Sequence, residues 1–99
     1  MFRPSAADHD RVAELAREIE GFDGRAVPVV LDVTNAESVR TAVAAAETEL
    51  GPITILVNNA GIAMTKPALR TDEHDWDRVI DTDLKGAWLM AKEVAAHMV

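Results

Sequence analysis

Two short polar segments each follow an apolar run, and their residue types suit contact with a flat, polar ligand. Asp32 and Val33 end the first run, so a carboxylate and a backbone N–H stand together there. The second run leads into two amides and two very small residues, Asn58, Asn59, Ala60 and Gly61. The amides both donate and accept hydrogen bonds, and the small residues let a ligand approach the backbone closely. These two segments are the first candidates for a binding site.

Each segment also has a purely structural interpretation. Asp32 stands beside Thr34 and could simply help to cap the helix that follows, and the strand context alone supports both roles equally. Segment 58–61 could be an ordinary turn of the Asn-Gly type between a strand and a loop. The residues themselves are compatible with both the binding role and the structural role.

Composition excludes several other kinds of chemistry. The 99 residues contain no cysteine, which excludes disulfide scaffolds, Cys-type zinc sites and thiol nucleophiles. They contain no tyrosine either, so a reaction that needs a phenol has no group here. A formal net charge of −7 argues against a nucleic-acid partner and against an anionic membrane surface. With 48% hydrophobic residues and no long apolar run, we expect one globular cytoplasmic unit over residues 1–99.

Hydrophobic periodicity predicts helices and strands in the order αβαβα. The expected helices cover residues 8–20, 34–50 and 72–99, and the expected strands cover residues 26–33 and 53–58. Thr34, followed three residues later by Glu37, predicts a capping box at the start of the second helix, and Gly51-Pro52 ends it. Both strands read as apolar on both faces. This pattern is typical of an α/β fold with a doubly wound parallel sheet, in which ligands bind beyond the carboxyl ends of the strands.

Three motifs in this order resemble the short-chain dehydrogenase/reductase family. They are Leu-Asp-Val-Thr at 31–34, Gly-Pro-Ile-Thr-Ile-Leu-Val-Asn-Asn-Ala-Gly at 51–61 and Asp-Leu-Lys-Gly-Ala at 83–87. The resemblance implies a Rossmann fold that binds NAD or NADP and exchanges hydride between nicotinamide and an alcohol or carbonyl substrate. It implies that Asp32 meets the adenine amine, that the Val33 N–H meets the ring, and that segment 58–61 lines the adenine ribose. It also implies a catalytic, proton-relay position for Asp83, where the family usually has asparagine.

The sequence departs from the family pattern at decisive places. It contains no glycine-rich phosphate turn, no catalytic serine after the second strand motif and no Tyr-x-x-x-Lys motif. We therefore expect an internal fragment of a partial Rossmann domain that lacks the first two strands and the last ones, and that is inactive by itself. The alternative is a non-catalytic truncated paralogue that acts as an interaction module. The two strands present would be the third and fourth, which are not neighbours in the sheet, so we expect marginal stability.

The last predicted helix, residues 72–99, carries an acidic run and two tryptophans. The acidic run with His74 is interpreted as a solvated face, and no metal site is expected. Trp76 and Trp88 are interpreted as core or as a helix interface, and His97 as a surface residue. The family resemblance implies that this helix packs against its mate in a homo-oligomer.

Overall fold

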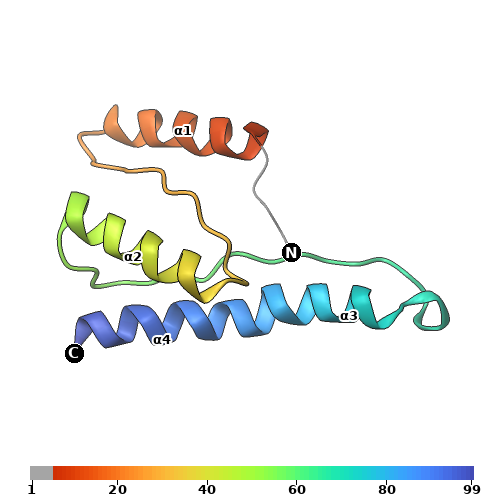
Figure 1. Ribbon diagram of the computed structural model, residues 1–99. Coiled ribbons are helices and arrows are strands. Elements are labelled where there is room, and N and C mark those ends of the chain that lie inside the picture. The colour runs from red at the N-terminus through yellow and green to blue at the C-terminus, as the bar shows by residue number, and fades with distance from the viewer. Residues whose placement is uncertain (1–5) are drawn as a thin grey trace.

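The computed structural model describes the backbone of residues 6–99 and the side chains of residues 10–99. Its elements are α1 (Ala6–Glu20), α2 (Ala36–Leu50), the 3-10 turn η1 (Ala68–Arg70), α3 (Glu73–Ile80), the π-helical turn η2 (Asp81–Lys85) and α4 (Gly86–Met98). Figure 1 shows α3, η2 and α4 as one continuous rod, with α2 lying along α4 and α1 standing apart. The three predicted helices are therefore present.

The two segments predicted to be strands are extended but unpaired. Within residues 6–99 no strand is assigned, and no backbone hydrogen bond joins residues 26–33 to residues 53–58. A strand is defined by the ladder that it makes with a neighbour, and the third and fourth strands of a doubly wound sheet are not neighbours. The expected parallel sheet is thus not formed among the described residues, although both segments that would build it are extended.

A small core lies between α2, α4 and the two extended segments. Val39 and Val43 of α2 contact Val94 of α4, and each of the three is only 2% exposed. Partly buried side chains from the extended segments and from α4 pack around them: Leu31, Ile53, Leu56, Leu89 and Met90. Spacing by three and four predicted Val39, Val43 and Val94 for the apolar faces of these helices, since residues three and four apart share one helix face. On the long helix the same spacing also selected Leu84, which is 66% exposed, and it missed Leu89 and Met90.

The start of α2 differs from the predicted capping box. Asn35 is the N-cap, and its side-chain oxygen accepts a hydrogen bond of 3.0 Å from the Ser38 N–H. The Thr34 hydroxyl instead donates to Asp32, and Glu37 pairs with Arg40. Asparagine is at least as good an N-cap as threonine, and moving the cap by one residue frees Thr34 for the preceding turn.

The long C-terminal helix contains a π turn that periodicity did not predict. The Gly86 N–H donates to the carbonyl of Asp81, five residues earlier, whereas an α-helix bonds to the fourth. A π turn inserts one extra residue and so rotates the residues after it relative to those before it. Within residues 6–99 no helix is long and apolar enough to span a bilayer.

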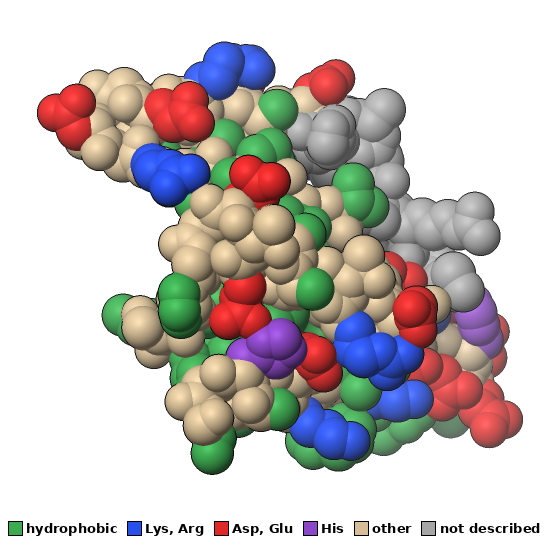
Figure 2. Space-filling model, turned by 60° about the vertical axis from the view of Figure 1, so that its left-hand side comes forward, with side chains coloured by type: hydrophobic (Ala, Val, Ile, Leu, Met, Phe, Trp, Pro, Cys, Tyr) green, Lys and Arg blue, Asp and Glu red, His purple; other side chains and the backbone are tan. Residues whose placement is uncertain are grey.

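The molecule is more open than a compact domain of its length. Its radius of gyration is 15.4 Å, against about 13 Å for a compact chain of 100 residues. Large apolar side chains of α1 and of the extended segments are exposed, among them Val12, Leu15, Val30, Ile55 and Val57. In Figure 2 the apolar side chains of the visible face do not form one patch but alternate with charged ones. The openness follows from the unpaired segments, which leave α1 without an apolar layer to cover.

Candidate functional site

The carboxyl ends of the two extended segments meet beside η2 and enclose a cavity of about 240 Å³. Four residues predicted from the sequence line it: Val33, Asn59, Ala60 and Gly61. Leu31, Ile62 and Thr82 complete the lining. Ligands of open α/β folds bind at this end of the strands, so the cavity stands where the sequence placed the candidate site.

Asp32 does not line the cavity, and its side chain shapes the turn that presents Val33. Its Oδ1 accepts hydrogen bonds from the Thr34 N–H at 3.0 Å and from the Thr34 hydroxyl at 2.6 Å. Its own N–H donates to the Ser38 hydroxyl at 2.9 Å, which ties the turn to the first turn of α2. Asp32 therefore organises the turn before α2 but does not cap the helix, since Asn35 does that. The hydrogen bonds within the described residues leave its Oδ2 available.

Asn58 lies outside the cavity and anchors the second segment to the long helix. Its side-chain N–H donates to the Ala87 carbonyl at 3.3 Å, across 29 residues of sequence. This bond fixes the carboxyl end of the segment just before Asn59, Ala60 and Gly61 enter the cavity wall. The role of Asn58 in this geometry is to position its neighbours.

Asp83 of η2 binds the loop that directly follows Asn59, Ala60 and Gly61 in the cavity lining. Its Oδ1 accepts a hydrogen bond of 2.8 Å from the Ile62 N–H. Gly61 lies so close that an added Cβ there would stand 3.3 Å from this carboxylate oxygen. A carboxylate that accepts from a backbone N–H makes a strong, directional link, so Asp83 ties the loop after Gly61 to η2.

Thr82 and Ile62 are the site residues that sequence reasoning missed. Thr82 is 5% exposed and faces the cavity from η2. The sequence signal that could have pointed to it is a threonine that stands between Asp81 and Asp83 in an acidic stretch. Ile62 directly follows the Asn-Asn-Ala-Gly motif, and its position was evident only once the loop was seen to fold back toward Asp83.

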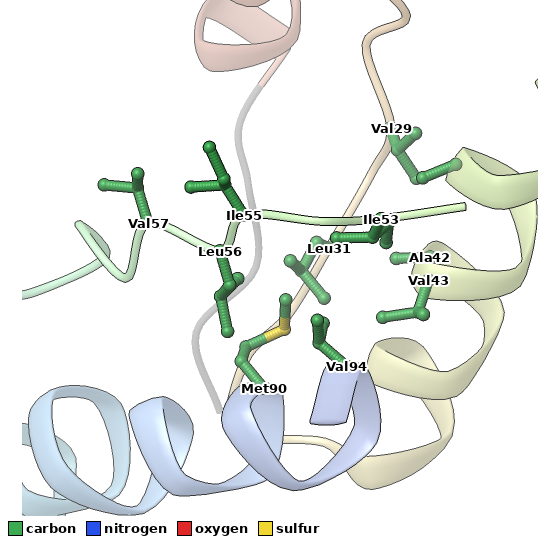
Figure 3. A pocket seen from close by; sticks show the side chains of 11 residues that line it. Val29, Leu31, Ala42, Val43, Ile53, Ile55, Leu56, Val57, Met90 and Val94 are labelled. Carbon is green, nitrogen blue, oxygen red and sulfur yellow. The ribbon is translucent and has the colours of Figure 1, made fainter. Parts of the chain in front are cut away.

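A second cavity, of about 280 Å³, lies between the extended segments and the pair α2–α4 (Figure 3). All its lining residues are apolar: Val29, Leu31, Ala42, Val43, Ala46, Ile53, Ile55, Leu56, Val57, Met90 and Val94. In Figure 3 Leu31 and Leu56 point toward Met90 and Val94, whereas Ile55 and Val57 point away from α4. A binding site for a polar ligand needs a few polar groups that orient it, and none lines this cavity. It is an apolar hollow beside the core that is open to solvent, since its lining residues Ile55 and Val57 are about four-fifths exposed.

The loop after the first cavity is fixed to α3 by an ion pair. Lys66 Nζ lies 2.8 Å from Asp75 Oδ2, and the Asp75 side chain is 9% exposed. The hydrogen bond from Lys66 is the main cause that lowers the pKa of Asp75, and the same bond raises the pKa of Lys66. Asp72 caps α3 by accepting from the Asp75 N–H at 2.7 Å. The prediction that the acidic run is a solvated face is therefore wrong for Asp75.

The described residues contain no group of three His, Asp or Glu side chains that could hold a metal ion.

His97, interpreted from sequence as a plain surface residue, bridges two helices. Its Nδ1 pairs with Glu47 of α2 and its Nε2 lies 3.2 Å from Glu93 of α4. These contacts, first with Glu93 and then with Glu47, raise the pKa of His97 above 6.5.

Comparisons with known proteins match this arrangement. The sequence profile of the family described as short chain dehydrogenase matches residues 5–99. The 3-oxoacyl-[acyl-carrier-protein] reductase FabG of Thermotoga maritima is 36% identical over 91% of this chain and 37% of its own length. Gluconate 5-dehydrogenase of Gluconobacter oxydans is 38% identical over 88% of this chain and 33% of its own length. The chain thus spans about a third of the length of the curated relatives that it matches.

Solved structures show the same similarity in three dimensions. A dehydrogenase/reductase from Sinorhizobium meliloti 1021 has a TM-score of 0.87 and 31% identity, covering 94% of this chain and 36% of that one. A blue fluorescent protein from a metagenomic library, solved in complex with NADPH, has a TM-score of 0.84 and 29% identity, covering 93% of this chain and 37% of that one. These matches support the predicted α/β Rossmann arrangement. They leave the partial sheet unconfirmed, because the described residues form no strand.

Proposed function

The chain belongs to the short-chain dehydrogenase family, and we propose that it supplies the adenosine-side contacts for NAD or NADP in an oxidoreductase. Such an enzyme exchanges hydride between nicotinamide and an alcohol or carbonyl substrate, and the bound cofactor supplies the hydride donor or acceptor. The observation that carries the proposal is the cavity beside η2, where four of the motif residues converge. Residues 1–99 then form part of one NAD(P)-binding Rossmann domain, with residues 26–33 and 53–58 in the third and fourth strand positions.

The cavity fits one part of a dinucleotide. Its volume of about 240 Å³ is below the 300–1,000 Å³ that is typical of sites for whole drug-sized ligands. Leu31, Val33 and Ile62 offer apolar surface to a flat ring, and Asn59 offers an amide that both donates and accepts. Ala60 and Gly61 leave the backbone open to a ligand. This chemistry suits adenine and its ribose.

The turn at the end of the first segment has a donor and an acceptor that are not used by other described residues and that could bind adenine. Its hydrogen bonds within the described chain use the N–H groups of Asp32, Thr34 and Asn35, but not that of Val33. Asp32 also keeps Oδ2 available while Oδ1 holds Thr34. In the proposed complex the Asp32 carboxylate accepts from the exocyclic amine, and the Val33 N–H donates to the ring.

Asp83 serves as the relay position in the proposal. Its carboxylate accepts from the Ile62 N–H, so its side chain already holds the loop that follows the cofactor motif. Asparagine offers the same acceptor oxygen with nearly the same shape. Replacing Asp83 by Asn in a longer protein that contains this region should therefore change activity only modestly, and a total loss or large gain would contradict this role.

The 99-residue chain by itself is proposed to be inactive. Proton transfer to or from a substrate needs a group of suitable pKa within hydrogen-bond reach, and the tyrosine that the family uses is absent from this sequence. Its residues bind and position the adenosine side, and none of them supplies the proton. We propose a cytoplasmic location, for which the support is a globular composition with 48% hydrophobic residues and no long apolar run.

A ligand titration tests the proposal. ADP-ribose, which carries the adenosine side only, should shift the backbone amide resonances of residues 32–33 and 59–62 at millimolar concentration. Nicotinamide mononucleotide, which lacks adenine, should leave the same resonances in place. The fluorescence of Trp76 and Trp88 should report no binding of NAD(P)H tighter than about millimolar, since one partial cavity buries little of the cofactor. Equal shifts with both ligands, or none with ADP-ribose, would reject an adenosine site.

A second candidate function is a non-catalytic module that oligomerises through residues 72–99. The supporting observation is an exposed apolar row on the long helix: Trp76 is 62% exposed, Leu84 66% and Trp88 56%. The prediction of core packing for the two tryptophans is therefore wrong, and an interface with a second copy remains the proposal for both functions. Exposed aromatic side chains of this kind are typical of protein interfaces.

Light scattering after size exclusion tests this interface. Leu84→Glu should shift the chain toward the monomer, because it places a charge in the middle of the row. Leu69→Glu is the matched control, since Leu69 is a fully exposed leucine on η1 and is not a residue of that row. If the wild-type chain is already monomeric at high concentration, the oligomerisation module is excluded.

A further inference from the structure

Gly86 stands at the first position of α4 with a conformation that any residue could adopt. Its φ of −60° and ψ of −44° are ordinary helical values, so glycine is not needed for the backbone. Glycine is also a poor residue inside a helix, where alanine is preferred. The reason for a glycine at this position must lie in what surrounds it.

The surroundings of Gly86 leave no room for a side chain. A Cβ added there would stand 2.7 Å from Val33 Cγ2 and 3.1 Å from Val33 Cβ. Carbon atoms in van der Waals contact are separated by about 3.5–4.0 Å, so even a methyl group would force Val33 to move. The helix and the end of the first extended segment approach this closely only because residue 86 has no side chain.

Val33 cannot move without changing the shape of the cavity. It is 9% exposed, and its β-branched side chain has few alternative rotamers. It lines the same cavity as Asn59 and Gly61 of the second segment's loop. A displacement of Val33 therefore has to move the backbone that forms this wall of the cavity.

The other wall is held by the same helical segment. Asp83, three residues before Gly86, accepts from the Ile62 N–H and fixes the loop after Gly61. Thr82, from the same π turn, lines the cavity between the two walls. The π turn, closed by the bond from the Gly86 N–H to the Asp81 carbonyl, sets the rotation between Asp83 and Gly86. One short stretch of helix thus fixes both walls.

We propose that Gly86 is a positioning residue that sets the width of the adenosine cavity by letting Val33 seat directly on the helix. The identity of the ligand rests on the proposed function, whereas the seating of Val33 does not. The expected consequence is that a methyl group at position 86 pushes Val33 outward and opens the cavity. Removing the Val33 methyl groups abolishes the 2.7 Å contact, which is the shortest one. The remaining distances, 3.1 Å to the Cβ of residue 33 and 3.2 Å to the Asp81 carbonyl oxygen, then require shifts of only a few tenths of an ångström.

The test compares Gly86→Ala, Val33→Ala and the double variant with the wild-type 99-residue chain. The initial slope of the amide shifts against ADP-ribose concentration should fall about tenfold in Gly86→Ala, as expected for an overpacked contact. In the double variant the slope should return to within about twofold of that of Val33→Ala. Lys85→Ala is the control, because Lys85 is the exposed neighbour of Gly86 and should leave the slope unchanged.

The outcomes separate this inference from the proposed function. If the wild-type chain does not respond to ADP-ribose, the adenosine site is rejected. The contact between Val33 and Gly86 is then tested without ligand, by the amide resonances of residues 59–61. Residues 59–61 line the same cavity as Val33, so Gly86→Ala should shift their resonances and the double variant should restore them. Unchanged resonances, a slope in Gly86→Ala equal to wild type, or an unfolded Gly86→Ala that the second substitution does not rescue would each overturn the proposal.

Discussion

The pair α2–α4 and the extended segments 26–33 and 53–58 are both rich in apolar residues, but they differ in how fully their side chains are buried and their backbone groups are hydrogen-bonded. Val39, Val43 and Val94 of the helix pair are each 2% exposed, whereas Ile55 and Val57 are about four-fifths exposed. A helix makes its backbone hydrogen bonds within itself, so it needs only one apolar contact to be stable. An extended segment needs a neighbour for its backbone as well as for its side chains.

The difference shows which part of the chain makes its own packing and hydrogen bonds, and which part has backbone groups and apolar side chains that need a further neighbour. The helix pair already has its core, its caps and a bridging histidine between α2 and α4. The extended segments pack Leu31, Ile53 and Leu56 against this core, but they leave their other side exposed, and α1 has Leu15 54% exposed. The candidate site sits at the boundary, because its walls are the ends of the extended segments and the helix fixes them.

Hydrogen exchange should show the largest contrast between the two regions. Relative to unprotected peptides, amides inside α2 and α4 should exchange at least about a hundredfold more slowly than those of residues 26–33 and 53–58. Amides of an extended segment without a ladder have no partner to exclude water. Equal protection in both regions, together with a sharp cooperative melt of a monomer, would mean that the extended segments are paired after all.

Removing side-chain volume in the helix pair should have the next largest effect. Val94→Ala should lower the free energy of unfolding by about 2 kcal/mol, since it removes two buried methyl groups and leaves a cavity beside Val39 and Val43. Val57→Ala, at a residue 78% exposed, should change it by less than about 0.5 kcal/mol. Urea unfolding followed by circular dichroism measures both, and similar losses at the two sites would contradict the contrast.

The boundary between the regions should respond to the loss of the Asp83 carboxylate. Asp83→Ala should destabilise the loop after Gly61 by about 1 kcal/mol, because the Ile62 N–H loses its acceptor. Asp83→Asn keeps an oxygen at the same place and should stay close to wild type. Exchange of the Ile62 amide is the direct measurement, and identical rates in the alanine and asparagine variants would remove Asp83 from its anchoring role.

The smallest expected effect is a pH dependence inside the helix pair. The contacts with Glu93 and Glu47 raise the pKa of His97 above its unfolded value of 6.5, so folding favours the protonated ring. The added stability is complete below about pH 6.5 and is lost as the pH rises through the raised pKa. Unfolding midpoints should therefore fall from about pH 5.5 to about pH 8.5.

The His97→Gln variant should remove this fall. His74→Gln is the control, because His74 is exposed near the start of α3 and should leave the pH profile of the wild type in place. A rise of the midpoint with pH in the wild type would have the opposite sign to the one that these contacts produce.

The helices could be predicted from the sequence more fully than the rest of the fold. The spacing of apolar residues gave all three helical regions, and Gly51, with φ of 87°, ends α2 where Gly51-Pro52 predicted it. The sheet could not be obtained in the same way, because alternation of apolar residues shows that a segment is extended but not which segment pairs with it. The capping residue also moved by one, from Thr34 to Asn35, since both residue types serve as caps.

Most residues of the candidate site could be predicted from the sequence, but which of them line the cavity and which position the others could not. Val33, Asn59, Ala60 and Gly61 line the cavity, while Asp32, Asn58 and Asp83 act behind it. The assigned contacts with cofactor stay predictions. Thr82 escaped the motif search, and Gly86 was part of the motif at 83–87 but was given no role, because each acts through residues about 20–50 positions away in the sequence.

By itself the sequence determined what is local: the helical regions to within a residue or two, the apolar face of α2, and which motif residues follow each extended segment. Hydrogen bonds within a helix and the caps of its ends join residues only a few positions apart, so the residue order contains them. Only the tertiary structure decided that Val33 seats on Gly86, that Asp75 is buried against Lys66, and that His97 bridges α2 and α4. These contacts depend on distances between remote segments, which are set by packing and not by spacing along the chain.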